Sequence, residues 1–266
     1  MLQMYVKKLL LALALLGIIF YLFVGCAPTV PNGGNSGTEG EGEQGTSDRV
    51  VMVELFVAPT CGRCPSAKLA IDSLSNKYGL ERMVILEEYG WDGLGAPYTG
   101  WYTQETAARF KWYKDTNQTP DAYFNGLNQN VPYYEFSLFS YQAAIEAELE
   151  RPAKVAISAS YDLTELTVSI SGKINNMSSD ALEDLVIGAM VYEDSVPLGM
   201  STANHVVRDI IISEQIESFS EGESLSFSLE SEILYNVKDI ENIHVVVYVQ
   251  APFSPTKEIL QALYVN

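Results

Sequence analysis

The spacing of apolar and polar positions divides the chain into parts with different periods. Residues 50–57 are almost continuously apolar, which is typical of a strand covered on both faces. Residues 65–78 then place apolar side chains at helical spacing ahead of Gly79, a natural helix stop, and residues 82–88 form a second apolar run. A strand, a helix and a strand joined by short links predict a βαβ unit with two parallel strands.

The next segment, residues 89–118, is rich in glycine and aromatic side chains and contains all three tryptophans. It begins as a loop and then predicts a helix from Thr103 to about Asp115. Aromatic clusters of this kind mostly belong to a core, and we also expect this segment to form part of a wall that faces a substrate.

A short strand opened by Thr119-Pro120 comes next, and Asn125-Gly126 predicts a hairpin turn after it. Residues 134–150 return to helical spacing. The whole pattern from 49 to 152 is therefore that of an α/β domain.

Beyond residue 152 the period falls to two, which is typical of strands with one buried face. Seven runs show this pattern, at 155–159, 166–174, 185–192, 205–212, 225–229, 243–249 and 259–265. Seven short strands in residues 153–266 predict an immunoglobulin-like β-sandwich. The predicted fold class is thus an α/β domain followed by an all-β domain.

The first 25 residues have the composition of an export signal. Lys7 and Lys8 precede an apolar run over residues 9–24, which is shorter than the roughly 20 residues of a membrane span. Residues 23–26 resemble the lipobox of bacterial lipoproteins, although Leu22 lies one place too early. The resemblance implies that residues 1–25 are removed and that Cys26 carries lipid; an uncleaved anchor remains the alternative.

Residues 26–48 are rich in Pro, Gly, Ser and Glu and lack apolar periodicity, so they predict a flexible tether. With the signal, this segment implies an extracytoplasmic location, with the protein lipid-anchored to a bacterial cell-envelope membrane.

The net charge of −18 is concentrated in the second half, where residues 153–266 carry 5 basic and 17 acidic side chains. An acidic surface repels nucleic acid, so we expect no nucleic-acid partner. We interpret the charge as a means of solubility rather than a recognition surface.

The candidate chemistry lies in Cys61-Gly62-Arg63-Cys64-Pro65, which follows the first strand and opens the helix. Residues three apart in the first helical turn share a face, so the two sulfurs can form a disulfide. The helix N-terminus favours a thiolate, which is the reactive form of cysteine. This pattern predicts a thiol–disulfide site.

Two other interpretations of the cysteine pair stay open, namely a purely structural disulfide and half of a metal site. If Cys26 carries lipid, Cys61 and Cys64 can pair only with each other. The two histidines, His205 and His244, provide no zinc-binding set of the usual spacing, so we expect neither a metal nor a cofactor.

A strand leading into Cys-x-x-Cys, with Thr-Pro ahead of a later strand, resembles the thioredoxin superfamily. The resemblance implies that Cys61 is the attacking sulfur and Cys64 the resolving one. It also implies that Pro120 has a cis peptide bond and, with Thr119, shapes a substrate groove. The lipobox adds a narrower resemblance to bacterial outer-membrane-associated lipoproteins with a thioredoxin-like domain and a β-rich C-terminal domain.

The chain departs from the thioredoxin pattern in several ways. Thr60 precedes the first cysteine, and Arg63 adds a positive charge that should make the disulfide easier to reduce. Pro65 has no N–H, so the first helical turn should be irregular. Glu54 lies one position away from the expected buried acid, so it either helps to deprotonate Cys64 or pairs with a neighbouring base.

Two functional hypotheses follow. In the first, the chain is an exported, membrane-tethered thiol–disulfide oxidoreductase that acts on protein thiols or disulfides and needs a redox partner. In the second, the α/β domain is a redox-inactive scaffold and the acidic sandwich binds a partner at the cell surface.

Overall fold

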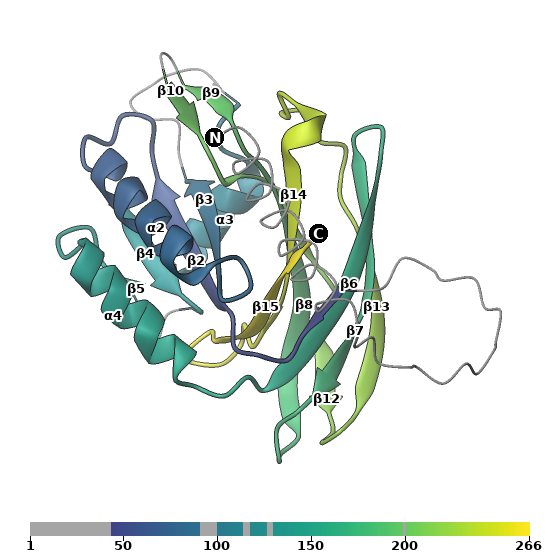
Figure 1. The fold of residues 1–266 in the computed structure, drawn as a ribbon. Helices are drawn as coiled ribbons and strands as arrows, with labels where there is room; N and C mark the ends of the chain where they lie inside the picture. The colour runs from purple at the N-terminus through teal and green to yellow at the C-terminus, as the bar shows by residue number, and fades with distance from the viewer. Residues whose placement is uncertain (1–43, 91–99, 114–117, 127–129, 199–200) are drawn as a thin grey trace, which may run out of the picture. The chain divides into compact units, whose positions relative to one another are not determined.

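The computed structural model describes residues 44–90, 100–113, 118–126, 130–198 and 201–266 (Figure 1). Within them, the secondary structure comprises three α-helices, one 3-10 helix and fifteen strands. Their bounds are β1 Gln44–Thr46, β2 Val51–Val57, α2 Cys64–Tyr78, β3 Met83–Tyr89, α3 Gln104–Tyr113, β4 Asp121–Phe124, β5 Asn130–Val131, α4 Leu138–Leu149, β6 Val155–Thr164, β7 Thr167–Asn176, β8 Leu182–Glu193, β9 Val196–Leu198, β10 Ser201–Ala203, β11 Val206–Ile212, β12 Ile216–Phe219, β13 Ser224–Glu230, η2 Ile240–Asn242, β14 Ile243–Gln250 and β15 Ile259–Val265.

One mixed sheet joins strands from both halves of the sequence. Its order is β15-β14-β8-β11-β3-β2-β4-β5, with β12 paired to β8. The β2–β3 pair is parallel, as the βαβ pattern predicts, and β11 joins the free side of β3 through a parallel bridge between Val206 and Glu87. A second sheet has the order β1-β6-β7-β13.

Apolar clusters on both faces of the strands hold these elements together. The face of β2 that carries Val53 and Leu55 packs under α2 and α4. The opposite face, with Met52, packs against side chains of the C-terminal strands such as Tyr248 and Ile259. The other face of β8 and β14 packs against the second sheet. The strands β8 and β14 are therefore covered on both faces.

The predicted fold class, a thioredoxin-like α/β domain followed by an immunoglobulin-like sandwich, is wrong. A helix-flanked domain needs helices over both faces of its sheet, whereas C-terminal β-strands, together with the single helix α3, cover the second face of β2 and β3. The C-terminal strands also continue the same sheet instead of forming a separate sandwich. The described residues are predominantly strand.

Most individual elements are nevertheless confirmed. Helix α2 ends at Tyr78, directly before Gly79, which has a positive φ of 79°. Each of the seven runs predicted in the second half contains a strand. The helix expected over 134–150 begins only at Leu138, because the Ser137 side chain accepts the Ser140 amide and caps it.

The aromatic segment contributes α3, which is capped as Thr103 suggested. The Thr103 hydroxyl accepts the Thr106 amide at 3.2 Å, and the Thr106 hydroxyl accepts the Thr103 amide at 3.1 Å. Trp101 is buried against Tyr89, in agreement with a core role. Trp91 and the other residues of 91–99 and 114–117 lie outside the described residues.

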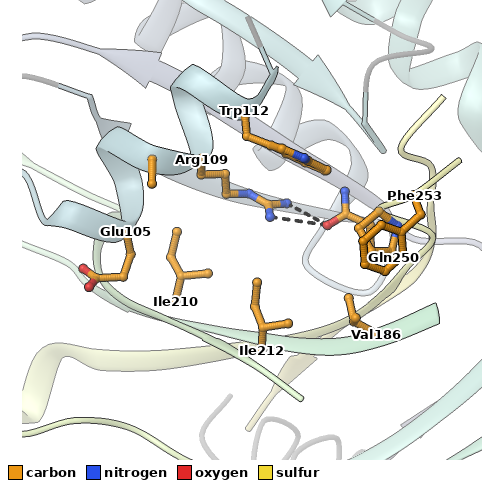
Figure 2. A pocket seen from close by; sticks show the side chains of 10 residues that line it. Glu105, Arg109, Trp112, Val186, Ile210, Ile212, Gln250 and Phe253 are labelled. Atoms are coloured by element: carbon orange, nitrogen blue, oxygen red, sulfur yellow. Dashed lines mark hydrogen bonds between the residues drawn. The ribbon is translucent and has the colours of Figure 1, made fainter. Parts of the chain in front are cut away.

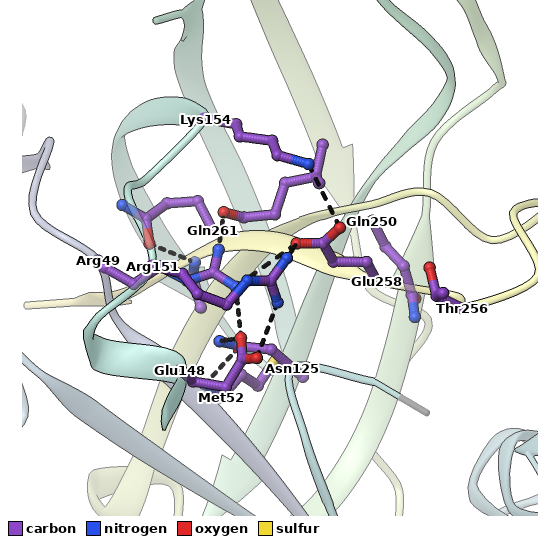
Figure 3. Close-up of polar contacts among 12 residues, drawn as sticks. Arg49, Met52, Asn125, Glu148, Arg151, Lys154, Gln250, Thr256, Glu258 and Gln261 are labelled. Atoms are coloured by element: carbon purple, nitrogen blue, oxygen red, sulfur yellow. Dashed lines mark hydrogen bonds and ion pairs between the residues drawn. The ribbon is translucent and has the colours of Figure 1, made fainter. Parts of the chain in front are cut away.

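A buried ionic cluster also joins the two halves of the sequence (Figure 3). The Arg49 guanidinium donates to the Glu148 carboxylate at 2.6 Å and to the Leu260 carbonyl. Arg151 bridges Glu148 and Glu258, the latter at the start of β15. Because paired charges compensate one another after desolvation, the cluster fixes the relative position of α4, β2 and β15.

The boundary expected between residues 152 and 153 falls between α4 and β6, and strands from both sides of it pair in one sheet. The end of the expected tether is ordered, because Gln44–Thr46 form β1 and pair with β6. The signal segment and Cys26 lie outside the described residues. Within the described residues, no helix has both the length and the apolar character of a membrane span.

Candidate functional site

The cysteine pair lies where β2 turns into α2. Cys61 and Cys64 form a disulfide with their Cα atoms 5.4 Å apart. The Cys64 amide donates to the Cys61 carbonyl at 3.3 Å and approaches the Cys61 sulfur at 3.1 Å. Cys64 is only 2% exposed, whereas Cys61 is half-buried. An incoming sulfur therefore reaches Cys61 more readily than Cys64.

The two residues between the cysteines face solvent. Gly62 is exposed, and a Cβ atom added to it would meet no atom within 4 Å. The Arg63 guanidinium lies over the Tyr133 ring, 5.7 Å from its centroid. Pro65 occupies the first helical turn, where the Arg63 carbonyl accepts from both Ser66 and Ala67.

The Thr119–Pro120 peptide bond is cis, as the resemblance implied. Pro120 is buried directly ahead of β4, which pairs antiparallel with β2. Extending the Phe56–Asp121 pairing by one residue places Pro120 beside Val57. Pro120 and the turn that carries the two cysteines therefore lie at the same end of the paired strands β2 and β4.

Glu54 does not lie with the cysteines. Its side chain is on the opposite face of β2, where it pairs with Arg109 and accepts from the Tyr113 hydroxyl at 2.6 Å. Burial, together with the Glu54 charge, raises the pKa of the neighbouring Glu88 well above its usual range. Of the two interpretations of Glu54, the structure supports the one that pairs it with a base.

A different acid, Glu87, accompanies the cysteines. It lies on β3 on the face that packs under α2, is 3% exposed, and pairs with Lys68, four residues after Cys64. The Lys68 ammonium also donates to the Tyr89 hydroxyl at 2.9 Å. Burial raises the pKa of Glu87 to about 7, even though Lys68 opposes the shift. A carboxyl with this pKa exchanges protons near neutral pH.

A cavity of about 330 Å³ joins these groups. The disulfide, Lys68 and Glu87 line one part of it. The C-terminal half supplies another part of its wall, at Ala203 in β10 and at Asn204 directly after it. This wall belongs to the site although more than a hundred residues separate it from the cysteines.

A second cavity, of about 410 Å³, lies between α3 and the strands β8 and β11 (Figure 2). Arg109 and Gln250 meet at its floor through hydrogen bonds of 3.3 Å. Its other walls are mainly apolar, and Ile212 and Phe253 are 54% and 66% exposed. Since α3 covers the face of β2 that carries Glu54, this cavity does not share a wall with the disulfide.

The two histidines have structural partners. Each histidine has one ring nitrogen near the Asp194 carboxylate. The distance is 3.5 Å from Nδ1 of His205 and 3.3 Å from Nε2 of His244. The second ring nitrogen of His244 lies 2.9 Å from the Tyr264 hydroxyl. Within the described residues, no group of three or more His, Cys, Asp or Glu side chains is arranged to hold a metal ion.

Known proteins share this fold, although their sequences differ widely. No family model and no curated protein matches the sequence. Among solved structures, HBP35 of Porphyromonas gingivalis is similar at a TM-score of 0.60 and 17% identity, over 82% of this chain and 75% of that one. Protein AGR_C_4864 of Agrobacterium tumefaciens is similar at 0.56 and 19% identity, over 83% and 96%.

A domain of the outer membrane lipoprotein Omp28 from Porphyromonas gingivalis also matches, at a TM-score of 0.32 and 21% identity over 43% of this chain and 88% of that one. This overlap is too limited to carry an argument about fold or function. The chain therefore has the fold of bacterial proteins that include HBP35, and at these identities the similarity extends to the fold alone.

Proposed function

We propose that the chain is an exported thiol–disulfide oxidoreductase, tethered to a bacterial envelope membrane, that acts on protein cysteines through Cys61 and Cys64. The observation that carries the proposal is the unequal exposure of the two cysteines in one disulfide. Thiol–disulfide exchange needs one accessible sulfur to form the mixed disulfide and one protected sulfur to leave or resolve it.

In the oxidising direction, a substrate thiolate attacks the Cys61 sulfur. The Cys61–Cys64 bond breaks, a mixed disulfide forms at Cys61, and Cys64 leaves as a thiolate that takes up a proton. A second substrate thiolate then attacks the substrate sulfur of the mixed disulfide and releases Cys61. The substrate loses two electrons to the cysteine pair, and a redox partner removes them afterwards.

In the reducing direction the same bonds form in reverse. The Cys61 thiolate attacks a substrate disulfide, and Cys64 then attacks Cys61 and expels the second substrate thiolate. In both directions the buried sulfur-bearing side chain of Cys64 gains or loses a proton. Glu87 lines the same cavity and has a pKa near 7, so it can supply or accept that proton.

The location is proposed from the N-terminus. A basic start, an apolar run and a cysteine at position 26 are the features of a lipoprotein signal. Lipid on Cys26 would hold the folded part at an envelope membrane. Disulfides persist there because this location lies outside the reducing cytoplasm.

Substitution of Cys64 by serine tests the proposal, because it removes the resolving sulfur and leaves Cys61 to hold its substrate. We expect the Cys64→Ser variant, when it is exported to the cell envelope, to accumulate mixed disulfides with other proteins. They should separate on reduction and be absent from the matched variant that also carries Cys61→Ser. Mixed disulfides that persist without Cys61, or their absence in both variants, would contradict the proposed function.

A second candidate function rests on the cavity of Figure 2. The exposed Ile212 and Phe253 beside it are suited to binding a partner. In that case the chain is a redox-inactive surface lipoprotein, and replacing both cysteines leaves its function intact while changes at Phe253 abolish it.

A further inference from the structure

The cavity beside the disulfide has a wall held in place from the C-terminal half. The Glu87 amide donates to the His205 carbonyl at 2.7 Å, and the His205 amide donates to the Asp194 carboxylate at 2.7 Å. Val196 and Ala203, from the two strands of the β9–β10 hairpin, are buried in the same core as Cys64. The cavity is thus a fixed part of the fold.

The acidic side chains of the cavity differ in their partners. Glu87 is paired with Lys68, whose ammonium also donates to Tyr89. Asp72, one turn further along α2, makes neither a hydrogen bond nor an ion pair within the described part of the chain. It is half-buried, so water compensates its charge only in part.

The titratable groups that face Asp72 compensate its charge only in part. They are Lys68, His205 and Asp194. Lys68 is already engaged by Glu87, and Asp194 is another acid. Burial lowers the pKa of His205, which leaves the imidazole neutral at pH 7. Burial likewise raises the pKa of Asp72, as expected for a carboxylate without a partner cation.

The rest of the cavity suits an aliphatic stem. Pro65, Leu69 and Ala203 line it, and Leu69 is 68% exposed at its edge. A long basic side chain has this combination of a methylene stem and a cationic end. Its size also fits, since a cavity of about 330 Å³ accommodates one side chain.

We propose that this cavity binds a lysine or arginine side chain of the substrate polypeptide that adjoins its reactive cysteine, with the Asp72 carboxylate accepting hydrogen bonds from the cationic end. The inference rests on the proposed function, because the cavity lies beside Cys61. It makes Asp72 a residue that determines which cysteines the pair reacts with.

The test uses the full-length oxidised protein in detergent at pH 7 and three peptides that each contain one cysteine. The peptides differ only beside the cysteine, where they carry lysine, norleucine or glutamate. The rate of mixed-disulfide formation should be about tenfold higher for the lysine peptide than for the norleucine peptide and lowest for the glutamate peptide.

The variant Asp72→Asn should react with the lysine and norleucine peptides at equal rates, and Asp72→Lys should favour the glutamate peptide. The control Glu81→Gln removes the same charge at an exposed residue outside the cavity and should keep the lysine preference. Equal rates for all three peptides in the wild-type protein, or a lysine preference that survives Asp72→Asn, overturn the inference.

If the proposed function is wrong, none of the three peptides reacts with the protein. In that case the same peptides with serine in place of cysteine test the cavity by equilibrium binding. Tighter binding of the lysine peptide that depends on Asp72 supports the cation site without the redox chemistry. Equal binding of all three peptides overturns it.

Discussion

At the scale of single residues, the site depends on acids whose positions the sequence did not reveal. Glu54 is the only charged residue in its strand, yet its carboxylate forms a buried ion pair with Arg109 and does not contact the cysteines. Glu87 lies in an equally buried strand beside Glu88, and only the β2–β3 register shows that it faces α2 and the cysteines. The signal in the sequence was two adjacent acids inside an apolar run.

The stability of the protein should depend on pH through Glu87. Its folded pKa of about 7 lies above the value of 4.5 for a free carboxyl, so the folded state holds a proton that the unfolded state has lost. The free energy of unfolding should therefore fall as pH rises from about 4.5 to 7, by about 3 kcal/mol from this group.

Glutamine mimics the protonated carboxyl, so Glu87→Gln should remove this part of the decrease. Urea titrations of the wild-type protein and of the variant across pH 4 to 8 measure the difference. Glu81→Gln, at an exposed carboxyl, serves as the control and should keep the wild-type slope. If the free energy of unfolding of Glu87→Gln falls with pH as steeply as that of the wild-type protein, the Glu87 carboxyl titrates normally.

At the scale of elements, the sequence predicts most helices and strands. It does not predict which elements pack over the faces of the sheet. Capping signals, Gly79 and the period of apolar positions are local, so α2, α3 and the C-terminal strands were found. A period of two predicts one buried face for the runs at 185–192 and 243–249. Their near-continuous apolar composition already indicated burial on both faces, and the second face is the one that packs against β2 and β3.

The pairing of β8 with β14 makes a prediction about glycine. Gly188 lies opposite Tyr248, and a Cβ atom added to it would come within 2.1 Å of the tyrosine ring. Tyr248 in turn accepts from Arg109 at 3.4 Å. We expect Gly188→Ala to lower the free energy of unfolding by about 2 kcal/mol, since overpacking forces the ring to move.

Chemical denaturation followed by circular dichroism measures this change. The matched control is Gly62→Ala, where an added Cβ meets no atom within 4 Å and stability should stay within about 0.5 kcal/mol of wild type. If the two variants are equally stable, the packing of Tyr248 over Gly188 does not constrain the sheet.

At the scale of the whole described chain, the arrangement of strands in one sheet decides how the protein unfolds. β11 pairs with β3, and side chains of β14 and β15 cover the second face of β2. The local period of apolar positions carries no information about such long-range pairing, so the sequence alone predicts two successive folds. The buried cluster around Arg49 and Glu148 links the same segments.

The described part of the full-length chain should therefore unfold in one cooperative transition. All three tryptophans lie in residues 91–112, so their fluorescence reports the first half, whereas far-ultraviolet circular dichroism mainly reports the strands of the second. We expect the two signals to give the same denaturation midpoint. Separate midpoints would indicate that residues 49–152 and 153–266 are independent domains after all.

The β9–β10 hairpin has a consequence for how proteins of this design diversify. Ala203 forms part of the wall of the cavity that the Cys61–Cys64 disulfide also lines. Recombination at the midpoint of the gene would join the segment that carries the disulfide to a foreign cavity wall, and it would replace Val196 and Ala203 in the core that they share with Cys64. Substitutions near Ala203 should therefore change the surroundings of the disulfide, although more than a hundred residues separate them from Cys61 in the sequence.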